Sequence, residues 1–519
     1  MPVNCVLAIV FLCTFAVSRW IRTRRLKMPP GPPPDPFIGN LRQMAFDKQE
    51  ERFAEWGRTY GSDVIHAKVF GRSMVILNSL QAARDLMEKR SLNYSCRPRL
   101  VLIVELMGWD SVITNLPYGD RFRKHRRLIQ DHFSAQAIVD FRSLQRKEAY
   151  TLLEGLFETP DDFIRHIRRF AAGTIMKIAY GHTVKSVDEL YVRLAEEAGI
   201  DTVTAVSPGA MLVDFFPVLK YIPSWMPGAG FKRHALGTRA KVRRMLDAPF
   251  QMVQSTLAAG TAVPSFTSGL LTENDNSNDT PVHDDEDIKG IAGVLYAAAT
   301  DTTSAIVISF ILSLVRYPEV LKKAQAEIDA VVGLDRLPDF DDRASLPYVE
   351  SLIKEVYRWS APVPLGLPHR CMNDDQYRGY DIPADTIVFP NIWAMTRDES
   401  VYPDAGSFVP ERFMGPIAEK AESTDPRDFV FGFGRRYAYE LMPECPGKLF
   451  ADANIWLIAA CVIATFDVFA CRDETGEAII PPAEFSPGFV RHPVRFNCNI
   501  KPRSQRSHDT IQQALNWVG

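Results

Sequence analysis

The feature that most constrains the fold is the stretch from Ile291 to Val315, which is almost entirely apolar and lies in the middle of the chain. Acidic residues at 284–287 precede it and favour the first turn of a helix. A helix over 287–316 has about 30 residues, which is enough to cross a bilayer. However, Asp301 and Thr302 stand in its middle, where a charge facing lipid is costly. We therefore predict a buried central helix that crosses a large domain.

The composition is that of a globular protein. Of the 519 residues, 46% are hydrophobic and 24% are charged, which excludes a disordered, collagen-like or polytopic membrane protein. The formal net charge is −3, so the overall charge does not indicate a nucleic-acid partner. Eight cysteines are too few for a disulfide scaffold and indicate reduced thiols in a cytosol-facing protein.

The amino terminus has the pattern of a membrane anchor. Residues 3–18 carry no charge, Trp20 and Ile21 extend the apolar run past Arg19, and a basic cluster begins at Arg22. A transmembrane anchor over 1–21 is short but workable, and the basic residues after it place the rest of the chain in the cytosol. The alternative is a cleaved signal peptide. The run has neither a charged segment before it nor a clear cleavage site after it, which argues against that alternative.

The rest of the chain divides into a linker and one domain. Residues 22–36 are basic and then rich in proline, which predicts a stiff, extended spacer. Residues 37–519 show no repeat and no second linker, so they are predicted to form a single domain. The expected elements are a hairpin over 64–77 that turns at Gly71-Arg72, mostly helices over 81–332, helices over 318–332, 347–360 and 448–466, a hairpin over 376–389, and a frayed tail after 500.

Three groups of residues have the potential for chemistry. Glu355 and Arg358 share one face of a predicted helix, and Arg412 could complete a buried network that needs full pairing. Burying Asp301 beside Thr302 in an apolar helix costs free energy, so the pair suggests a functional role. The alternative is that Thr302 bonds back to its own helix and Asp301 caps a local kink.

The third group is a glycine turn followed by a cysteine. Phe431-Gly432-Phe433-Gly434 permits close approach of the backbone to a flat ligand. Cys445 stands at the start of an apolar helix, where the helix dipole favours a thiolate. A buried structural thiol is the alternative for Cys445 taken alone.

In this order and spacing, these residues resemble the cytochrome P450 family over nearly the whole chain. Glu355 and Arg358 match its E-x-x-R motif, Arg412 its P-E-R-F segment, and Cys445 its haem-ligating cysteine. The acid and alcohol in the central helix match the pair found in the long helix of the family. The anchor and proline segment resemble the microsomal type, and the sequence at 366–370 resembles fungal members.

The resemblance implies a mainly α fold with a minor β region and the cofactor haem b (iron protoporphyrin IX). Cys445 would bind the iron, and Arg126, His369 and Arg436 would pair with the haem propionates. Thr302 would hold the activated oxygen through its hydroxyl, and Asp301 would help to relay protons from solvent.

The implied function is that of a haem-thiolate monooxygenase. It would insert one oxygen atom from O2 into a hydrophobic small molecule, with a fungal secondary metabolite as the expected class. Electrons would come from NADPH-cytochrome P450 reductase, docked near Lys124, Arg126 and Arg127. The protein would sit in the endoplasmic reticulum membrane through its single anchor, with the catalytic domain in the cytosol.

The loop before the cysteine departs from the family pattern. The family has one residue between the arginine and the cysteine, whereas residues 437–444 separate Arg436 from Cys445 here. Counting from Phe431, the usual cysteine position is Ala438, which cannot bind iron. The extra segment is either a genuine insertion or the product of a wrong exon boundary. Because of this extra segment, a haem-poor and inactive homologue is an alternative to the monooxygenase. An O2-independent isomerase or dehydratase is a further alternative, and Asp301 and Thr302 argue against it.

Overall fold

The computed structural model describes residues 26–45, 47–205, 211–276, 281–415, 425–434 and 445–518. The predicted anchor, Arg436 and the 437–444 segment lie outside these residues. The longer helices are α2 (Gln49–Thr59), α5 (Asp120–His132), α7 (Arg142–Glu158), α8 (Phe163–Tyr180), α9 (Leu190–Ala205), α11 (Gly230–Ala258), α12 (Phe266–Asp275), α13 (Asp285–Arg316), α14 (Pro318–Val331), α15 (Pro347–Ser360), α19 (Lys448–Thr465) and α20 (Gln505–Val518).

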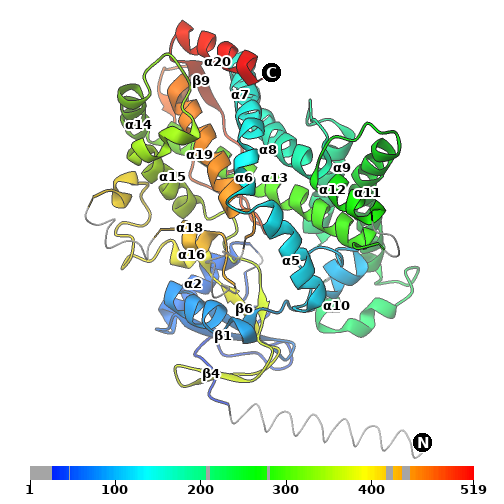
Figure 1. Cartoon of the computed structure of the whole chain (residues 1–519). Helices are drawn as coiled ribbons and strands as arrows, with labels where there is room; N and C mark the ends of the chain where they lie inside the picture. Colours follow the sequence, from blue (N-terminus) through cyan, green and yellow to red (C-terminus); the bar gives the residue numbers. More distant parts are fainter. Residues whose placement is uncertain are drawn as a thin grey trace, which may run out of the picture.

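Short helical turns connect these helices. They are α3 (Leu80–Ala83), η1 (Arg84–Glu88), α4 (Ser91–Tyr94), η2 (Val101–Leu106), α6 (Ala137–Asp140), η3 (Pro160–Asp162), α10 (Leu212–Phe215), η4 (Pro217–Tyr221), η5 (Phe340–Ser345), α16 (Ile392–Met395), η6 (Pro410–Phe413) and α18 (Arg427–Val430). The mainly α architecture with small sheets is the predicted one (Figure 1).

The central helix α13 joins two apolar cores. Its amino terminus is capped by Asp284, whose side chain accepts from the Glu286 N–H at 2.7 Å. Residues 288–296 pack into one core with α8 and α11, and residues 306–315 pack into the other with α15 and α19. Figure 1 shows α13 crossing the middle of the molecule. The predicted buried central helix is confirmed.

Two described helices, α13 and α19, are long and apolar enough to cross a membrane. In their most apolar windows, however, 72% and 67% of the residues are buried inside the domain. Both helices are therefore core helices of the domain, which is the reason for their apolar composition.

Within the described residues, the β strands form three small sheets. The largest has the order β1 (Val64–Val69), β2 (Arg72–Leu77), β6 (Ile387–Pro390), β3 (His369–Arg370). The others are β4 (Asp375–Tyr377) with β5 (Tyr380–Ile382), and β7 (Phe466–Arg472) between β8 (Ala478–Ile479) and β9 (Cys498–Pro502).

Two predicted hairpins need correction. The first turns at Phe70-Gly71 rather than Gly71-Arg72, with φ of 46° and 83°, and the positive values fit a tight two-residue turn. In the second, only β4 and β5 form a hairpin. The strand β6 pairs instead with β2 and β3 in the other sheet.

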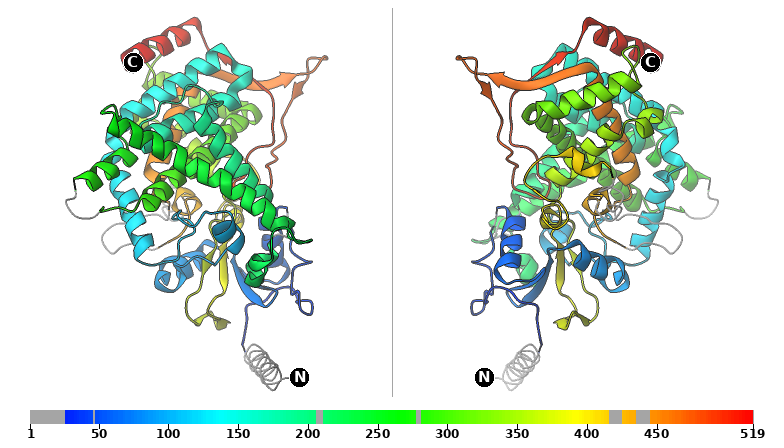
Figure 2. Two further views of the ribbon diagram at one scale, coloured as in Figure 1. Left: turned by 90° about the vertical axis from the view of Figure 1, so that its right-hand side faces the viewer. Right: turned by 90° about the vertical axis from the view of Figure 1, so that its left-hand side faces the viewer.

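The prediction of a frayed tail after residue 500 is wrong. The helix α20 packs against α7 and buries Thr510 and Ile511, and the ring of His508 stacks on Phe157 at 4.1 Å. Figure 2 places α20 at the end of the molecule opposite β1 and α2. The prediction failed because the segment is mostly polar. Its few apolar residues form one face of a helix, and that face is buried only against α7.

The proline-rich segment lies against the domain from Pro30 onward. The Pro30 carbonyl accepts from the His66 N–H at 2.9 Å, and Asn40 donates to the Pro32 carbonyl at 2.9 Å. A Cβ on Gly31 would lie 1.9 Å from the His66 oxygen, so only glycine fits there. By its contacts, this part of the expected spacer belongs to the folded domain.

Candidate active site

The predicted Glu355–Arg358–Arg412 network is present and buried. The Glu355 carboxylate accepts from Arg358 Nε and Nη2 at 2.7 Å each, from the Val409 N–H at 2.7 Å and from Arg412 Nε at 3.2 Å. The remaining donors of Arg358 bind backbone carbonyls, among them that of Thr396 at 2.9 Å. Glu355 and Arg358 are 0% exposed, and this complete pairing is what a buried charge requires.

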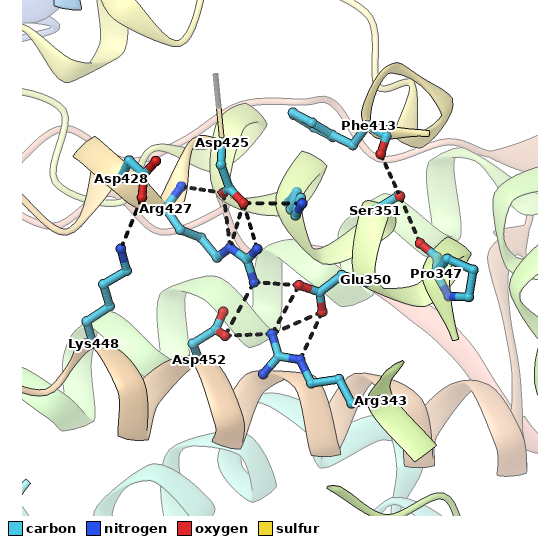
Figure 3. A network of polar contacts seen from close by, with 11 residues as sticks. Arg343, Pro347, Glu350, Ser351, Phe413, Asp425, Arg427, Asp428, Lys448 and Asp452 are labelled. Carbon is cyan, nitrogen blue, oxygen red and sulfur yellow. Dashed lines mark hydrogen bonds and ion pairs between the residues drawn. The ribbon is translucent and has the colours of Figure 1, made fainter. Parts of the chain in front are cut away.

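A second network, which we call the cysteine-loop clamp, joins both sides of the loop that carries Cys445 (Figure 3). It balances three basic and three acidic side chains from α15, α18, α19, η5 and the residues before α18. Its members are Arg343, Glu350, Lys354, Asp425, Arg427 and Asp452.

Arg427 is the centre of the clamp. It bonds Asp425 through two nitrogens at 3.0 and 2.6 Å, Glu350 at 2.6 Å and Asp452 at 3.4 Å. Arg343 bonds Glu350 and, at 2.6 Å, Asp452. Burial raises the pKa of Asp425, but the bonds from Arg427 outweigh it and hold that pKa at about 2.

Cys445 lies beside the glycine turn, although residues 435–444 separate the two in the sequence. The Cys445 N–H donates to the Phe431 carbonyl at 3.1 Å, and Lys448 reaches Asp428 at 3.5 Å across the loop. Gly432 has a φ of 93°, which explains the glycine at this point of the turn. The thiol is half-buried, and Cys445 lies three residues before Lys448, the first residue of α19, so it stands just outside the helix rather than in its first turn.

Asp301 and Thr302 lie in a break in the burial of α13. Residues 297–302 are half-buried or exposed, whereas the helix is buried on both sides of them. The Thr302 hydroxyl donates to the Ala298 carbonyl at 2.8 Å. The alternative hypothesis that Thr302 bonds back to its own helix is therefore confirmed. The Asp301 carboxylate does not cap a kink; it lies 2.8 Å from His492 Nε2.

The predicted propionate-binding residues lie on separate elements. Arg126 is half-buried on α5, and His369 is buried on β3. Burial, and then the charge of Arg97, lower the pKa of His369 well below its usual range. His369 Nδ1 contacts the Tyr94 carbonyl, so in the neutral ring Nε2 is an acceptor. His369 therefore donates to a carboxylate only when the ring is protonated.

Arg97 is a candidate site residue that the sequence analysis missed. It is 7% exposed, lies close enough to His369 to affect its pKa, and donates to the Pro368 carbonyl at 3.2 Å. Its segment is irregular, so no periodic pattern marks it. A guanidinium keeps its charge in a buried place and suits a carboxylate ligand better than a neutral imidazole does.

Comparison with known proteins assigns the family. The family model described as cytochrome P450 matches residues 29–500. This chain is a cytochrome P450. It is 42% identical over 512 residues to cytochrome P450 monooxygenase 176 of Postia placenta, covering 98% of this chain and 97% of the relative. It is 38% identical over 488 residues to tryptamine 4-monooxygenase of Psilocybe cyanescens, covering 93% and 94%.

As a P450, the protein is a haem-thiolate monooxygenase with haem b as its cofactor. The donor set fits this cofactor, because a thiol at a helix start suits iron and buried guanidinium groups suit carboxylates. When bound, haem supplies the activation of O2 and the insertion of one oxygen atom into an organic molecule. The chain's own residues hold the cofactor, exclude water from the cores and supply groups that can carry protons.

Proposed function

We propose that this P450 oxidises a small hydrophobic molecule of fungal secondary metabolism. In this proposal Cys445 is the iron ligand and Arg97, Arg126 and Arg436 bind the propionates, whereas His369, named with them from the sequence, joins them only when its ring is protonated. The names of the relatives support the class, since one of them acts on tryptamine. An indole, terpenoid or polyketide scaffold of similar size is the expected substrate.

The observation that carries the proposal is the accessible break at 297–302 between two apolar cores. Ala298 and Ala299 leave room beside the helix, and Asp301 and Thr302 bring an acid and an alcohol to the same stretch. The Thr302 hydroxyl hydrogen is committed to Ala298, so its oxygen is free to accept a proton or hydrogen bond. We assign proton delivery to this pair.

The membrane and reductase contacts are also proposals. Exposed apolar side chains follow α10: Phe216, Val218, Tyr221 and Trp225 are 44%, 70%, 73% and 77% exposed. Their aromatic members suit a membrane interface, which supports attachment to the endoplasmic reticulum in addition to the anchor over 1–21.

Electrons would come from NADPH-cytochrome P450 reductase docked at the basic face of α5. Arg127 is exposed there, whereas Lys124 is already bonded to Asp287 at 3.2 Å. We therefore assign the docking charge to Arg127 more than to Lys124.

The test uses the full chain in yeast microsomes with a fungal reductase. The reduced carbon-monoxide difference spectrum should show the thiolate band, and a panel that contains tryptamine, a sesquiterpene and an aromatic polyketide is then incubated under 18O2. A product that carries the heavy oxygen supports the proposal. A converted product without label would favour the isomerase alternative, and the absence of the thiolate band would favour the inactive homologue.

A further inference from the structure

A histidine from the last part of the chain contacts the acid in the break of α13. His492 Nε2 lies 2.8 Å from Asp301 Oδ1. An ionised carboxylate can only accept, so the ring donates this hydrogen bond. Of the two side chains, that of Asp301 is 54% exposed and that of His492 is 24% exposed. None of the roles assigned above uses His492.

The segment that carries His492 is held independently of α13. The His492 N–H donates to Ser486 Oγ at 3.1 Å, and its carbonyl accepts from the Ser486 N–H at 2.7 Å. The neighbouring Arg491 N–H donates to the Pro362 carbonyl at 2.8 Å, just beyond α15. The ring therefore reaches Asp301 from a fixed support, so its position does not depend on the acid that it binds.

This contact restricts a side chain that would otherwise have several rotamers. Asp301 is on a helix and is half exposed, so without a partner its carboxylate can turn into solvent. Elsewhere a polar contact of this exposure would have little effect on stability. Here it lies in the accessible stretch between two buried cores, next to Thr302, where the direction of the carboxylate decides which group receives its proton.

We propose that His492 is a positioning residue for proton delivery: its Nε2–H fixes the Asp301 carboxylate at the break of α13. This inference rests on the proposed role of Asp301 and adds a residue to it. The proposal requires a hydrogen-bond donor at position 492, not an imidazole as such. The amide nitrogen of glutamine can take the place of Nε2, whereas leucine cannot.

The first test measures whether the pair exists in the holoenzyme. Diethyl pyrocarbonate acylates accessible imidazole nitrogens, and mass spectrometry of peptides gives the rate at each histidine. Asp301→Ala should raise the rate at His492 by at least about threefold, because Nε2 loses its partner. His182, which pairs with Glu189 at 2.9 Å and is 28% exposed, is the internal control and should not change. An unchanged rate at His492 would overturn the inference.

The second test measures proton delivery without requiring a known substrate. In microsomes with reductase, hydrogen peroxide released per NADPH oxidised is compared among variants whose thiolate band is intact. His492→Leu and Asp301→Ala should raise this ratio by at least about twofold, because reduced oxygen whose protons are no longer directed by Asp301 leaves as hydrogen peroxide, which takes up two electrons and two protons, instead of being reduced to water. His492→Gln should restore the ratio of the unaltered protein.

The outcomes separate the two proposals. If Asp301→Ala raises the ratio and His492→Leu does not, His492 has no positioning role and the proposed function stands. If His492→Gln is as impaired as His492→Leu, a hydrogen bond is not what the residue supplies, and the inference is overturned. If Asp301→Ala has no effect, the proposed role of Asp301 fails and the inference fails with it.

Discussion

Replacing Asp452 by asparagine tests whether the cysteine-loop clamp holds Cys445, the proposed iron ligand. The substitution removes one of three negative charges, and Arg343 and Arg427 then face a neutral amide. Hydrogen bonds to charged groups contribute about 1.5–3 kcal/mol each. Solvent weakens this pairing, because the three side chains, Asp452, Arg343 and Arg427, are 14–27% exposed. We therefore expect the substitution to reduce the interaction free energy of the clamp by about 2 kcal/mol in total.

That cost acts on the loop more than on the whole domain. A change of about 2 kcal/mol shifts an equilibrium by about 30-fold. Because the clamp joins α18 to α19 on either side of Cys445, the affected equilibrium is the one between a held and a released thiolate. The expected result is a large loss of the thiolate band in the reduced carbon-monoxide spectrum, with most of the secondary structure retained.

The matched control is Asp329→Asn. Asp329 pairs with Arg503 through contacts of 2.8 and 2.5 Å, so the chemical change is the same at a pair that does not bridge the cysteine loop. Both variants are compared by thiolate band per unit of folded protein. If Asp452→Asn keeps the band as fully as Asp329→Asn does, Cys445 is not positioned by the clamp and the reasoning is refuted.

Three further predictions concern stability. Glu355→Gln should lower the free energy of unfolding by about 3–5 kcal/mol, because a buried charge network loses its acceptor. Glu411→Gln, at a carboxylate that is 40% exposed, should lower it by about 1 kcal/mol or less. Equal thermal midpoints of unfolding in the two variants would contradict this prediction. The pKa of Asp425 is lowered to about 2, so its contribution of about 2 kcal/mol is complete above about pH 4 and is lost as the pH falls towards 2. Acid unfolding followed by circular dichroism should therefore be flatter in Asp425→Asn, and an unchanged slope would count against the assignment. Gly31→Ala should loosen the proline segment and speed its proteolysis, since a Cβ would lie 1.9 Å from a backbone oxygen of β1. Gly199→Ala on α9, with open space around the new methyl group, should instead raise helix stability by up to about 1 kcal/mol, so similar proteolysis rates in the two variants would rule out the steric argument.

The sequence predicted those elements whose pattern is strong within one segment. The central helix α13 follows from its apolar run and acidic start, α15 from its periodicity, and α19 from its composition. The partners Glu355 and Arg358 could be predicted because they lie on one turn of helix. Arg412 could be added only through its motif, since nothing local brings it to the same carboxylate.

Features that depend on distant contacts could not be predicted. Arg97 and His492 lie in irregular segments, and tertiary structure alone brings them to His369 and Asp301. The helix α20 has a polar sequence whose few apolar residues matter only against α7. The cysteine-loop clamp combines residues from α15, α18, α19 and η5. In the sequence, each of these residues has the pattern of an ordinary charged surface position.

The position of α20 has a practical consequence for testing the proposed membrane attachment. The helix α20 packs against α7 and lies at the end of the domain opposite β1 and α2 (Figures 1 and 2). A fluorescent reporter fused to the carboxyl terminus would therefore have a fixed position at that end. Energy transfer from that reporter to a dye in the lipid would then measure how far the body tilts towards the bilayer surface.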